Sequence, residues 1–311
     1  MDGPDQRASL LRARLTSAFQ TELAVPPGTE HHLAEALTET LQRTGNFIRA
    51  QLAYSMAQSY GLQGEAALQL AIAMEYFHTA SLLFDDLPSM DDATHRRGAM
   101  CVHHLYGEGS AILTALALIN RGYALLWRAV STGASNDPSK EEALAYVEKY
   151  LGLGGLLNGQ SHDLHYSELP LAERSPQNVA MGKTVSLIRL SLVLPAIMGG
   201  AAPGVLRLLD RLAVFWGLAY QALDDLKDVL QETELTGKTT ARDTLLNRPN
   251  LALTIGSEAT LRRLDRLVAL GKRLVDRLQH LQSSLTCLDV PGARLEREVA
   301  AVGGELLGAK R

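Results

Sequence analysis

Residues 65–84 are apolar on nearly every side of the helix that their composition predicts, and they run directly into the paired carboxylates Asp85 and Asp86. A helix that is apolar all round has to be buried, so this segment predicts a helix through the centre of a helical fold. Other long segments are rich in Ala, Leu, Gln, Glu and Arg, and their apolar residues recur at three- and four-residue spacing. These segments are residues 33–60, 111–130, 140–158, 205–230 and 260–285.

No segment shows the strict alternation of a half-buried strand. Turn-forming residues mark breaks at 26–28, 131–139, 169–177, 199–204 and 248–250, and residues 131–139 are expected to form an exposed loop. None of these breaks resembles a long linker between domains. We therefore expect an all-α fold in which residues 1–311 form one domain, a bundle of about a dozen helices.

Bulk composition narrows the functional classes. A net charge of −4 over 311 residues gives no global positive field, which argues against nucleic acid as a partner. Cys101 and Cys287 lie far apart and outside any metal-binding spacing, which indicates free thiols in a reducing compartment. No stretch reaches the roughly 20 uninterrupted apolar residues of a membrane helix. We therefore expect a cytoplasmic protein with no transmembrane segment.

Two runs of acidic residues stand at the ends of apolar segments. Asp224 and Asp228 are four residues apart, so one face of a helix would carry both carboxylates. Asp85 and Asp91 are too far apart for a regular helix, but Pro88 between them should end or bulge the helix and bring Asp91 back beside Asp85. Clustered carboxylates repel one another unless a cation neutralises them. Hard oxygen ligands favour Mg²⁺, which also binds phosphate oxygens.

The plain alternative for either acidic run is a solvated helix end. That alternative is weak here because both runs follow strongly apolar segments and both have basic residues nearby. Arg96 and Arg97 follow the first run, and Lys238 follows the second. Arginine offers a planar fork to diphosphate oxygens, and lysine offers a point charge. The pattern therefore predicts one site in which magnesium and basic side chains hold a diphosphate.

The order of these motifs resembles that of the trans-isoprenyl diphosphate synthases, the polyprenyl synthetase family, from residue 44 to residue 250. Residues 81–92, followed by Arg96-Arg97-Gly98, are similar to the longer form of that family's first aspartate-rich motif. The other matches are Gly159-Gln160-Ser161-His162-Asp163-Leu164 to its Gly-Gln-x-x-Asp-Leu segment, Lys183-Thr184 to its Lys-Thr pair, residues 220–228 to its second motif, and Gly237-Lys238 to its Gly-Lys pair. Each match alone is weak, whereas five in the family's order and spacing are specific.

The resemblance implies the isoprenoid synthase fold, a single all-α domain around a deep central cavity, and a homodimer. It implies condensation of isopentenyl diphosphate with an allylic prenyl diphosphate, with Mg²⁺ as cofactor. The implied metal ligands are Asp85, Asp91, Asp224 and Asp228. The implied catalytic residues are Asp85, Asp91, Arg96, Lys183, Asp224 and Lys238. The allylic diphosphate would contact Arg96, Lys183, Gln221 and Lys238, with Thr184 beside it, and isopentenyl diphosphate would contact Arg49, His78 and Arg97.

Some of these residues also have a purely structural interpretation. A histidine inside an apolar segment, such as His78, is often a satisfied core residue, but His78 stands seven residues before Asp85 as the family's histidine does. Gln160 and Asp163 are interpreted as hydrogen-bonding links between helices rather than as catalytic groups. Lys238 in isolation would be a surface charge.

The chain departs from the family on the side that would bind isopentenyl diphosphate. The family's Gly-Gly-Lys-Arg-x-Arg-Pro segment corresponds to residues 44–50, in which Asn46 replaces the lysine and Phe47 replaces an arginine. Loss of one charge-assisted contact costs on the order of 1.5–3 kcal/mol, which would weaken that site. Leu116 also replaces a charged residue of the family, and we hypothesise that Phe47 and Leu116 pack together.

These departures leave two alternatives to a condensing enzyme. A class I terpene synthase on the same scaffold ionises and cyclises an allylic diphosphate, so it would need only the aspartate half of the site. A regulatory subunit of a heteromeric synthase is the other alternative, and the intact aspartate motifs disfavour it.

The length of the product depends on residues one and two turns before the first motif. In relatives, bulky aromatic residues one turn back stop the chain at farnesyl diphosphate. Here those positions are Ala80 and Ser81, with Phe77 a further turn back as the next possible floor. The small side chain of Ala80 predicts a cavity that continues, and hence geranylgeranyl diphosphate as product, with farnesyl or longer products as alternatives.

Overall fold

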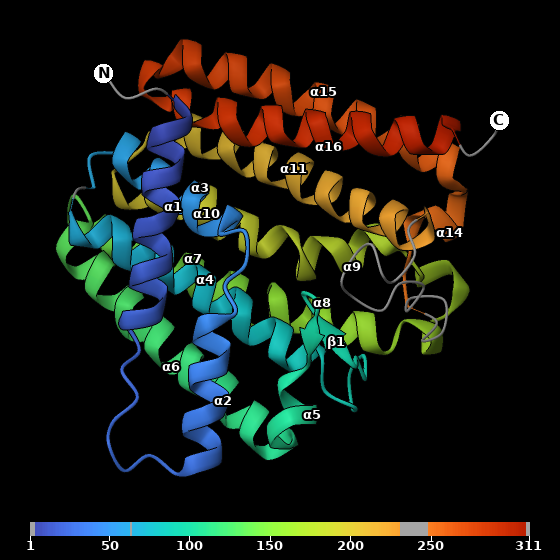
Figure 1. The fold of residues 1–311 in the computed structure, drawn as a ribbon. Coiled ribbons are helices and arrows are strands. Elements are labelled where there is room, and N and C mark those ends of the chain that lie inside the picture. Colours follow the sequence, from blue (N-terminus) through green and yellow to red (C-terminus); the bar gives the residue numbers. More distant parts are fainter. Residues whose placement is uncertain (1–3, 63, 231–247, 309–311) are drawn as a thin grey trace.

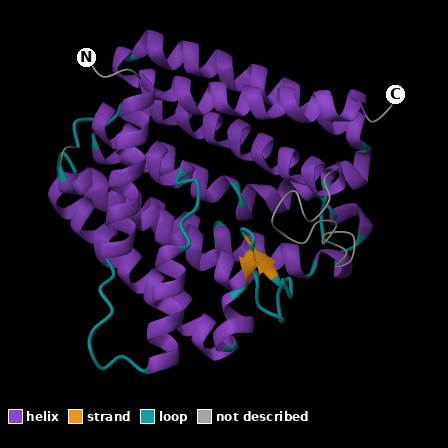
Figure 2. Ribbon diagram, in the orientation of Figure 1, coloured by secondary structure: helices purple, strands orange, loops and turns teal. Residues whose placement is uncertain are grey.

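The computed structural model describes residues 4–62, 64–230 and 248–308. Their arrangement is shown in Figure 1, and Figure 2 shows that helices account for almost all of it. Within these residues the strands are limited to a short antiparallel hairpin of β1 (His95–Arg96) and β2 (Ala99–Met100), which the sequence did not suggest. The expected all-α fold is confirmed.

The helices range from single turns to the 28 residues of α11. In chain order they are α1 (Pro4–Thr21), α2 (His31–Gln42), α3 (Ile48–Ser59), α4 (Glu65–Asp85), α5 (Val102–Tyr106), α6 (Glu108–Gly133), α7 (Asp137–Leu151), α8 (Leu156–Leu164), α9 (Pro176–Lys183), α10 (Val185–Met198), α11 (Pro203–Leu230), α14 (Leu251–Ile255), α15 (Ser257–Leu281) and α16 (Asp289–Gly308). Three short 3₁₀ turns complete the described elements: η1 (Tyr166–Glu168), η2 (Leu171–Glu173) and η3 (Ser283–Leu288).

Helix α4 lies in the middle of the bundle, where its all-round apolar sequence predicted it. It packs against α1, α3, α6 and α10, and most of its side chains are buried. A helix enclosed by apolar neighbours is held rigidly along its length. Its last residue, Asp85, is therefore presented from a fixed support.

Helix α11 forms the opposite support. Leu212, Trp216, Ala219, Leu223 and Leu226 are buried at alternating four- and three-residue spacing, which gives the helix one continuous apolar face. It packs against α10 on one side and against α15 on the other, and α15 and α16 form the outer layer at the top of Figure 1.

The chain bends by 43° between α9 and α10. The bend falls at Lys183 and Thr184, where α9 ends and α10 begins. A bend exposes side chains that a continuous helix would turn toward its neighbours. Both residues thereby reach the cavity described below.

Several expected boundaries were wrong. The single segment expected over residues 33–60 is split into α2 and α3 by the turn around Gly45, and residues 140–158 are split between α7 and α8. The loop expected at 131–139 is much shorter, because α6 continues to Gly133 and Asn136 already caps α7. The Asn136 side chain accepts a hydrogen bond from the Ser139 amide at 2.8 Å.

Helix α6 has two contrasting faces. The inner face packs along α4, whereas Ile112, Leu116, Tyr123 and Trp127 form an exposed apolar stripe, with Trp127 60% exposed. Among the described helices, α6 is long and apolar enough to qualify as a membrane span by length and composition, and α9 with α10 would qualify as one bent pair. A helix packed in a protein core meets the same criteria, and α6 is interrupted by Asn120 and Arg121, so it is not an uninterrupted apolar stretch.

Candidate active site

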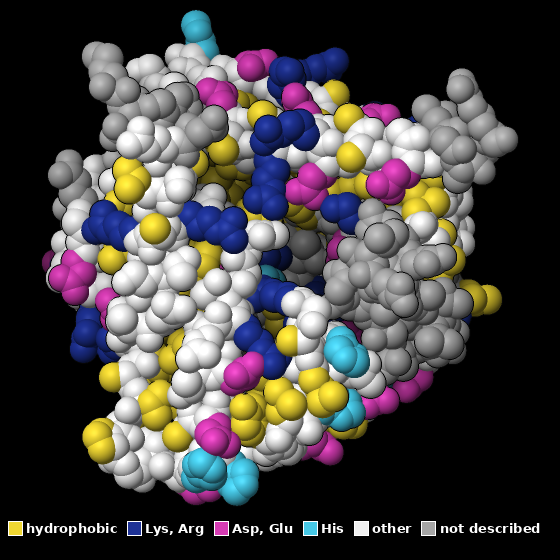
Figure 3. Space-filling view, in the orientation of Figure 1, with side chains coloured by type: hydrophobic (Ala, Val, Ile, Leu, Met, Phe, Trp, Pro, Cys, Tyr) yellow, Lys and Arg dark blue, Asp and Glu magenta, His cyan; other side chains and the backbone are white. Residues whose placement is uncertain are grey.

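A cavity of about 410 Å³ lies between the end of α4 and the facing side of α11, with α8, α9 and α10 between them. Figure 3 shows a recess on this face of the molecule, with Lys and Arg side chains around it. It is lined by carboxylates and basic groups, and also by the apolar side chains of Ile48, Leu82, Leu156, Leu187 and Ile188.

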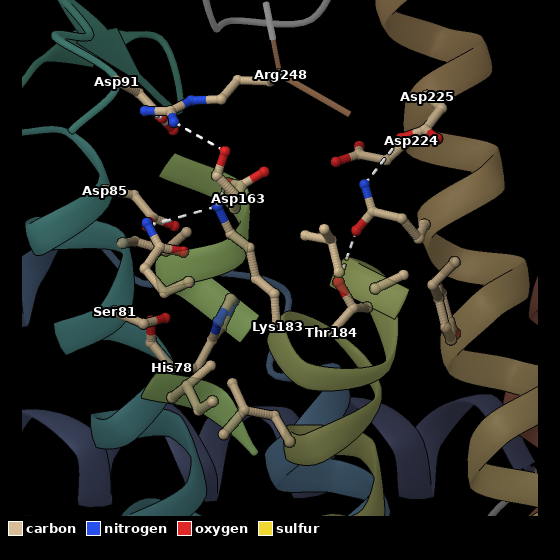
Figure 4. A pocket seen from close by; sticks show the side chains of 18 of the residues that line it. His78, Ser81, Asp85, Asp91, Asp163, Lys183, Thr184, Asp224, Asp225 and Arg248 are labelled. Carbon is tan, nitrogen blue, oxygen red and sulfur yellow. Dashed lines mark hydrogen bonds and ion pairs between the residues drawn. The ribbon is translucent and has the colours of Figure 1, made fainter. Parts of the chain in front are cut away.

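The first wall is built where α4 stops. The helix ends at Asp85, and the turn containing Pro88 returns the chain so that the Asp91 amide donates to the Asp85 carbonyl oxygen at 2.9 Å. Asp85 and Asp91 both line the cavity (Figure 4), as the proline between them predicted. Burial raises the pKa of Asp85 to about 6, against the opposing effect of Lys183.

Asp86, the neighbour of Asp85, has a different role. Its carboxylate accepts hydrogen bonds from Arg96 Nε at 2.9 Å and from Arg96 Nη2 at 2.5 Å, and its side chain is almost fully buried. Arg96 lines the cavity, whereas Asp86 does not. Asp86 therefore holds Arg96 in place from behind.

The second wall is α11, which carries Asp224 and Asp228 one turn apart into the cavity. Gln221, one turn earlier, accepts a hydrogen bond from Thr184 Oγ1 at 2.6 Å and donates to Asp225 Oδ1 at 2.8 Å. Asp225 Oδ2 in turn accepts the Leu251 amide at 2.7 Å. This chain of bonds ties α10, α11 and α14 together and fixes the orientation of Gln221.

Lys183 stands between the two walls (Figure 4). Its Nζ donates to Asp163 Oδ2 at 2.7 Å and lies 3.7 Å from Asp85 Oδ1. Burial lowers the pKa of Lys183, but the neighbouring carboxylates of Asp85, Asp163 and Asp91 outweigh burial and raise it overall. Lys183 is therefore a fixed cation, and Asp163, interpreted from the sequence as a link between helices, is the group that orients it.

Arg248 is a site residue that the sequence analysis missed. Its guanidinium donates to the Met90 carbonyl at 2.8 Å and to the Asp163 carbonyl at 3.0 Å, and it lies 3.3 Å from Asp91 Oδ1. It lines the cavity, and only 8% of its side chain is exposed. The one available signal was a basic residue within the break expected at 248–250, which follows the second acidic motif.

Arg49 and His78 are in contact at the cavity wall. They mark the side that the family resemblance assigns to isopentenyl diphosphate, here called the acceptor side. Arg49 Nη1 donates to His78 Nε2 at 3.1 Å. Burial, and then Arg49, lowers the pKa of His78 well below its usual value, so the imidazole is neutral and Nε2 can accept. Glu75, one turn earlier on α4, is almost fully buried and is electrostatically coupled to both Arg49 and Arg97. No motif or spacing in the sequence singles out Glu75.

Arg97 does not line this cavity; it borders a small neighbouring hollow. Its guanidinium lies against Gly45, where a Cβ would come within 2.5 Å of Nη2, and Nη1 donates to the Arg43 carbonyl at 3.3 Å. The expected contact of Arg97 with the same ligand as Arg49 and His78 is therefore not preformed.

Of the residues expected to limit product length, only one lines the cavity. Ser81 lines the cavity, but Ala80 and Phe77 do not. The Phe77 ring lies against Gly122 of α6, where a Cβ would come within 3.1 Å, and its centroid is 5.0 Å from that of Tyr123. The side chains of Ala80 and Phe77 are packed in the core. Ser81 is therefore the residue of this group that faces the cavity.

The donor set of the cavity fits Mg²⁺. Carboxylates on both walls offer hard oxygen ligands, which this ion prefers, together with phosphate oxygens and water. Within the described part of the chain, no three acidic, His or Cys side chains are gathered closely enough to form a finished metal cage. In proteins Mg²⁺ is usually bound by one or two carboxylates together with phosphate oxygens of a ligand.

Comparison with known proteins is decisive for the family. The family model described as polyprenyl synthetase matches residues 30–284. This chain belongs to the polyprenyl synthetase family. The heterodimeric geranylgeranyl pyrophosphate synthase large subunit 2 of Arabidopsis thaliana is 31% identical over 264 residues, which cover 84% of this chain and 68% of that protein. The chloroplastic geranylgeranyl pyrophosphate synthase of Capsicum annuum is 32% identical over 230 residues, covering 73% and 62% respectively.

Solved structures support the family's fold for this member. The geranyltransferase of Helicobacter pylori, crystallised with magnesium and isoprenyl diphosphate, superposes with a TM-score of 0.77 at 23% identity over 99% of both chains. The geranyltranstransferase of Thermotoga maritima gives a TM-score of 0.74 at 24% identity, covering 95% of this chain and 99% of that one. At this level of identity the likeness concerns the fold alone.

Most of the site residues inferred from the family resemblance gather at one cavity. Those that line it are Arg49, His78, Ser81, Asp85, Asp91, Arg96, Lys183, Thr184, Gln221, Asp224 and Asp228. Lys238 lies outside the described residues. Phe47 has its ring against Phe19 at a centroid distance of 5.6 Å, whereas Leu116 is 49% exposed on α6, so the proposed Phe47–Leu116 pair does not account for the burial of Phe47.

Proposed function

We propose that this family member condenses isopentenyl diphosphate with an allylic prenyl diphosphate to give a longer all-trans prenyl diphosphate. One observation carries the proposal: carboxylates from the end of α4 and from α11 face each other across a cavity that also holds Lys183, Arg96 and Arg248. Such an arrangement suits a ligand with several negative charges and bound cations, because each charge finds an opposite charge at a fixed place.

The charged residues of the cavity would stabilise the departing diphosphate. Mg²⁺, held by Asp85, Asp91, Asp224 and Asp228, would neutralise negative charge on the diphosphate. Lys183 and Arg96 both line the cavity and would need little rearrangement, since Asp163 and Asp86 already hold them. This arrangement lowers the cost of breaking the allylic carbon–oxygen bond, whose electron pair leaves with the diphosphate.

The apolar lining of the cavity would protect the allylic cation left by that cleavage. Leu82, Leu187 and Ile188 line the cavity and would exclude water, which would otherwise quench the cation. The double bond of isopentenyl diphosphate then supplies the electrons for the new carbon–carbon bond. The proton lost from that substrate passes to the released diphosphate.

We place the isopentenyl diphosphate beside Arg49 and His78. Arg49 lines the cavity and is oriented by its bond to the neutral imidazole of His78. Asn46, which stands where relatives carry a lysine, has an exposed side chain and adds no charge. We therefore expect isopentenyl diphosphate to bind more weakly than it would with a lysine at this position.

We propose geranylgeranyl diphosphate as the product. The relatives from Arabidopsis thaliana and Capsicum annuum are named as synthases of that compound, and the small side chain of Ser81 leaves the cavity wall open one turn below Asp85. Farnesyl diphosphate is the nearest alternative, since the similar solved structures are described as geranyltransferases.

A terpene synthase that cyclises the allylic diphosphate is the second candidate. Asn46 favours it, because a cyclase needs no second diphosphate and the acceptor side of this cavity has lost a basic residue. The preserved arrangement of Arg49 and His78 favours condensation instead, because a neutral imidazole held by a buried guanidinium has no evident use in cyclisation.

We further propose that a second copy of the chain packs on the exposed stripe of α6, giving a homodimer. Ile112, Leu116, Tyr123 and Trp127 lie on one face of that helix, and contiguous apolar area of this kind usually marks an interface. We also propose a cytoplasmic location, on the basis of Cys101 and Cys287, which form no disulfide with each other.

Product analysis with purified protein tests the proposed reaction. The protein is incubated with Mg²⁺, isopentenyl diphosphate and each allylic diphosphate in turn, and products are identified by mass spectrometry. A longer diphosphate supports condensation. A hydrocarbon or alcohol formed from the allylic substrate alone supports the cyclase instead, and no turnover with any combination contradicts both.

A pair of conservative variants locates the reaction in this cavity. Asp224→Asn removes a carboxylate from the cavity wall and should abolish turnover. Asp137→Asn, which changes an exposed aspartate at the start of α7, is the matched control and should leave turnover unchanged. Equal activities of the two variants would place the reaction elsewhere.

A further inference from the structure

Phe47 adopts a backbone conformation that an aromatic residue rarely takes. Its φ is +53° and its ψ is 27°, the left-handed region, at the residue that precedes α3. Such a conformation is strained in a residue with a Cβ and persists only where the surroundings enforce it. The Phe47 side chain makes no capping hydrogen bond, and Gln51 Nε2 donates to the Asn46 carbonyl oxygen at 3.2 Å, so this one bond and the packing of the ring hold the conformation.

The packing is an aromatic cluster of Phe19, Phe47 and Tyr76. The rings of Phe47 and Phe19 meet edge-on, with their centroids 5.6 Å apart. The centroids of the Phe19 and Tyr76 rings are 5.0 Å apart. The Tyr76 hydroxyl donates to the Phe19 carbonyl oxygen at 2.8 Å. All three side chains are essentially fully buried. The cluster therefore fastens the end of α1 and the start of α3 to the central helix α4.

The residues on either side of Phe47 belong to the acceptor side of the active site. Ile48 and Arg49 line the cavity, and Arg49 bonds to His78. Gly45 lies so close to the Arg97 guanidinium that even a Cβ would collide with it. Asn46 between them is exposed and so gives the turn no buried anchor of its own.

We propose that Phe47 is a positioning residue for the acceptor substrate, an inference that rests on the proposed condensation. Its ring, held by Phe19 and Tyr76, fixes the turn of residues 45–48, and that turn sets where Arg49 stands and how Arg97 lies against Gly45. The chain thus uses apolar packing to hold a segment in which the family's pattern has basic residues. The three rings of the cluster come from α1, from the start of α3 and from α4, and none comes from α9 or α11, which carry Lys183 and Asp224.

Phe47→Gly tests the effect of the ring apart from that of the backbone conformation, because glycine adopts the left-handed conformation without cost but has no side chain. The measurement is steady-state kinetics of the purified full chain with each substrate varied in turn. The KM for isopentenyl diphosphate should rise about tenfold, as for one weakened charge-assisted contact, while the KM for the allylic diphosphate stays within about twofold. Phe47→Leu keeps an apolar side chain in the cluster and should restore most of the loss.

A matched core variant excludes general destabilisation. Leu278→Ala removes a fully buried side chain on α15, away from the described cavity, and should lower thermal stability without separating the two KM values. Hydrogen exchange should be faster at residues 44–50 in Phe47→Gly and unchanged along α11. Unchanged exchange in this turn, or equal rises of both KM values, overturns the inference. A wild-type protein that forms no condensation product contradicts the proposed function instead.

Discussion

Asp85 and Asp86 are adjacent in the sequence, yet replacing each with asparagine should change the stability of the metal-free protein in opposite directions. Asp85 is buried at the cavity wall, where its charge is unfavourable until cations bind. Asp86 is buried in a direct ion pair with Arg96. Asp85→Asn should therefore stabilise the fold at pH 8, and Asp86→Asn should destabilise it.

The size of the first effect follows from the pKa of Asp85. Burial raises that pKa from 3.8 to about 6, although Lys183 opposes the rise. A carboxyl group with a raised pKa contributes stability that is fully present below pH 3.8 and is lost as pH rises through about 6. A pKa raised by about two units means that ionised Asp85 lowers the free energy of unfolding by about 3 kcal/mol at pH 8. At pH 5 it lowers it by about half of that. That pKa already includes the attraction between Asp85 and Lys183, so a net gain of up to about 3 kcal/mol is expected at pH 8.

The assay is urea unfolding followed by circular dichroism, with a chelator present, at pH 5 and pH 8. Asp86→Asn removes the charged acceptor of two hydrogen bonds from Arg96 and should cost about 1.5–3 kcal/mol at both pH values. With Mg²⁺ and inorganic pyrophosphate added, the wild-type protein should gain stability through binding, and Asp85→Asn should gain little.

The reasoning is refuted if Asp85→Asn is less stable than the wild type at pH 8. It is also refuted if its stabilisation is larger at pH 5 than at pH 8, since the sign of the pH dependence is fixed by the raised pKa. Destabilisation by both substitutions would mean that Asp85, like Asp86, is paired favourably in the metal-free fold.

Four further substitutions test other parts of the site. Lys183→Met should lower kcat/KM for the allylic diphosphate by about a hundredfold in steady-state assays, because one fixed cation is lost from the diphosphate site; a change below threefold would contradict that role. Arg248→Ala should lower the free energy of unfolding by about 1–3 kcal/mol in urea titrations, because buried carbonyl groups lose their donor; an unchanged midpoint would contradict it. Ser81→Phe should shorten the product seen by mass spectrometry, whereas Ala80→Phe should chiefly lower thermal stability, because Ala80 lies in the packed core; the reverse outcome would restore Ala80 as the floor.

The central helix and the two aspartate motifs could be predicted from the sequence because their signals are local. An apolar helix all round has only one place in a bundle, and Pro88 limits how α4 can end. The four-residue spacing of Asp224 and Asp228 likewise fixes their common face. Each of these arguments needs only residues that are near one another in the chain.

The rest depended on contacts between distant segments. Arg248 reaches Met90 and Asp163, and its role is invisible without the folded arrangement of the three segments. In the sequence, Phe47 indicates only that the family's arginine is missing. In the structure its ring packs against the ring of Phe19 in α1. Phe77 looked like a cavity floor because its position along α4 was right, yet Gly122 on α6 gives its ring a place in the core.

The most direct test of the site is calorimetric titration of inorganic pyrophosphate into the protein with and without Mg²⁺. The account requires that Asp85, at the end of α4, and Asp224, on α11, hold the same metal–diphosphate ligand. Binding should therefore need Mg²⁺ in the wild type and should be lost in both Asp85→Asn and Asp224→Asn. Binding that is as tight in a chelator as in Mg²⁺, or that survives either substitution unchanged, would contradict the claim.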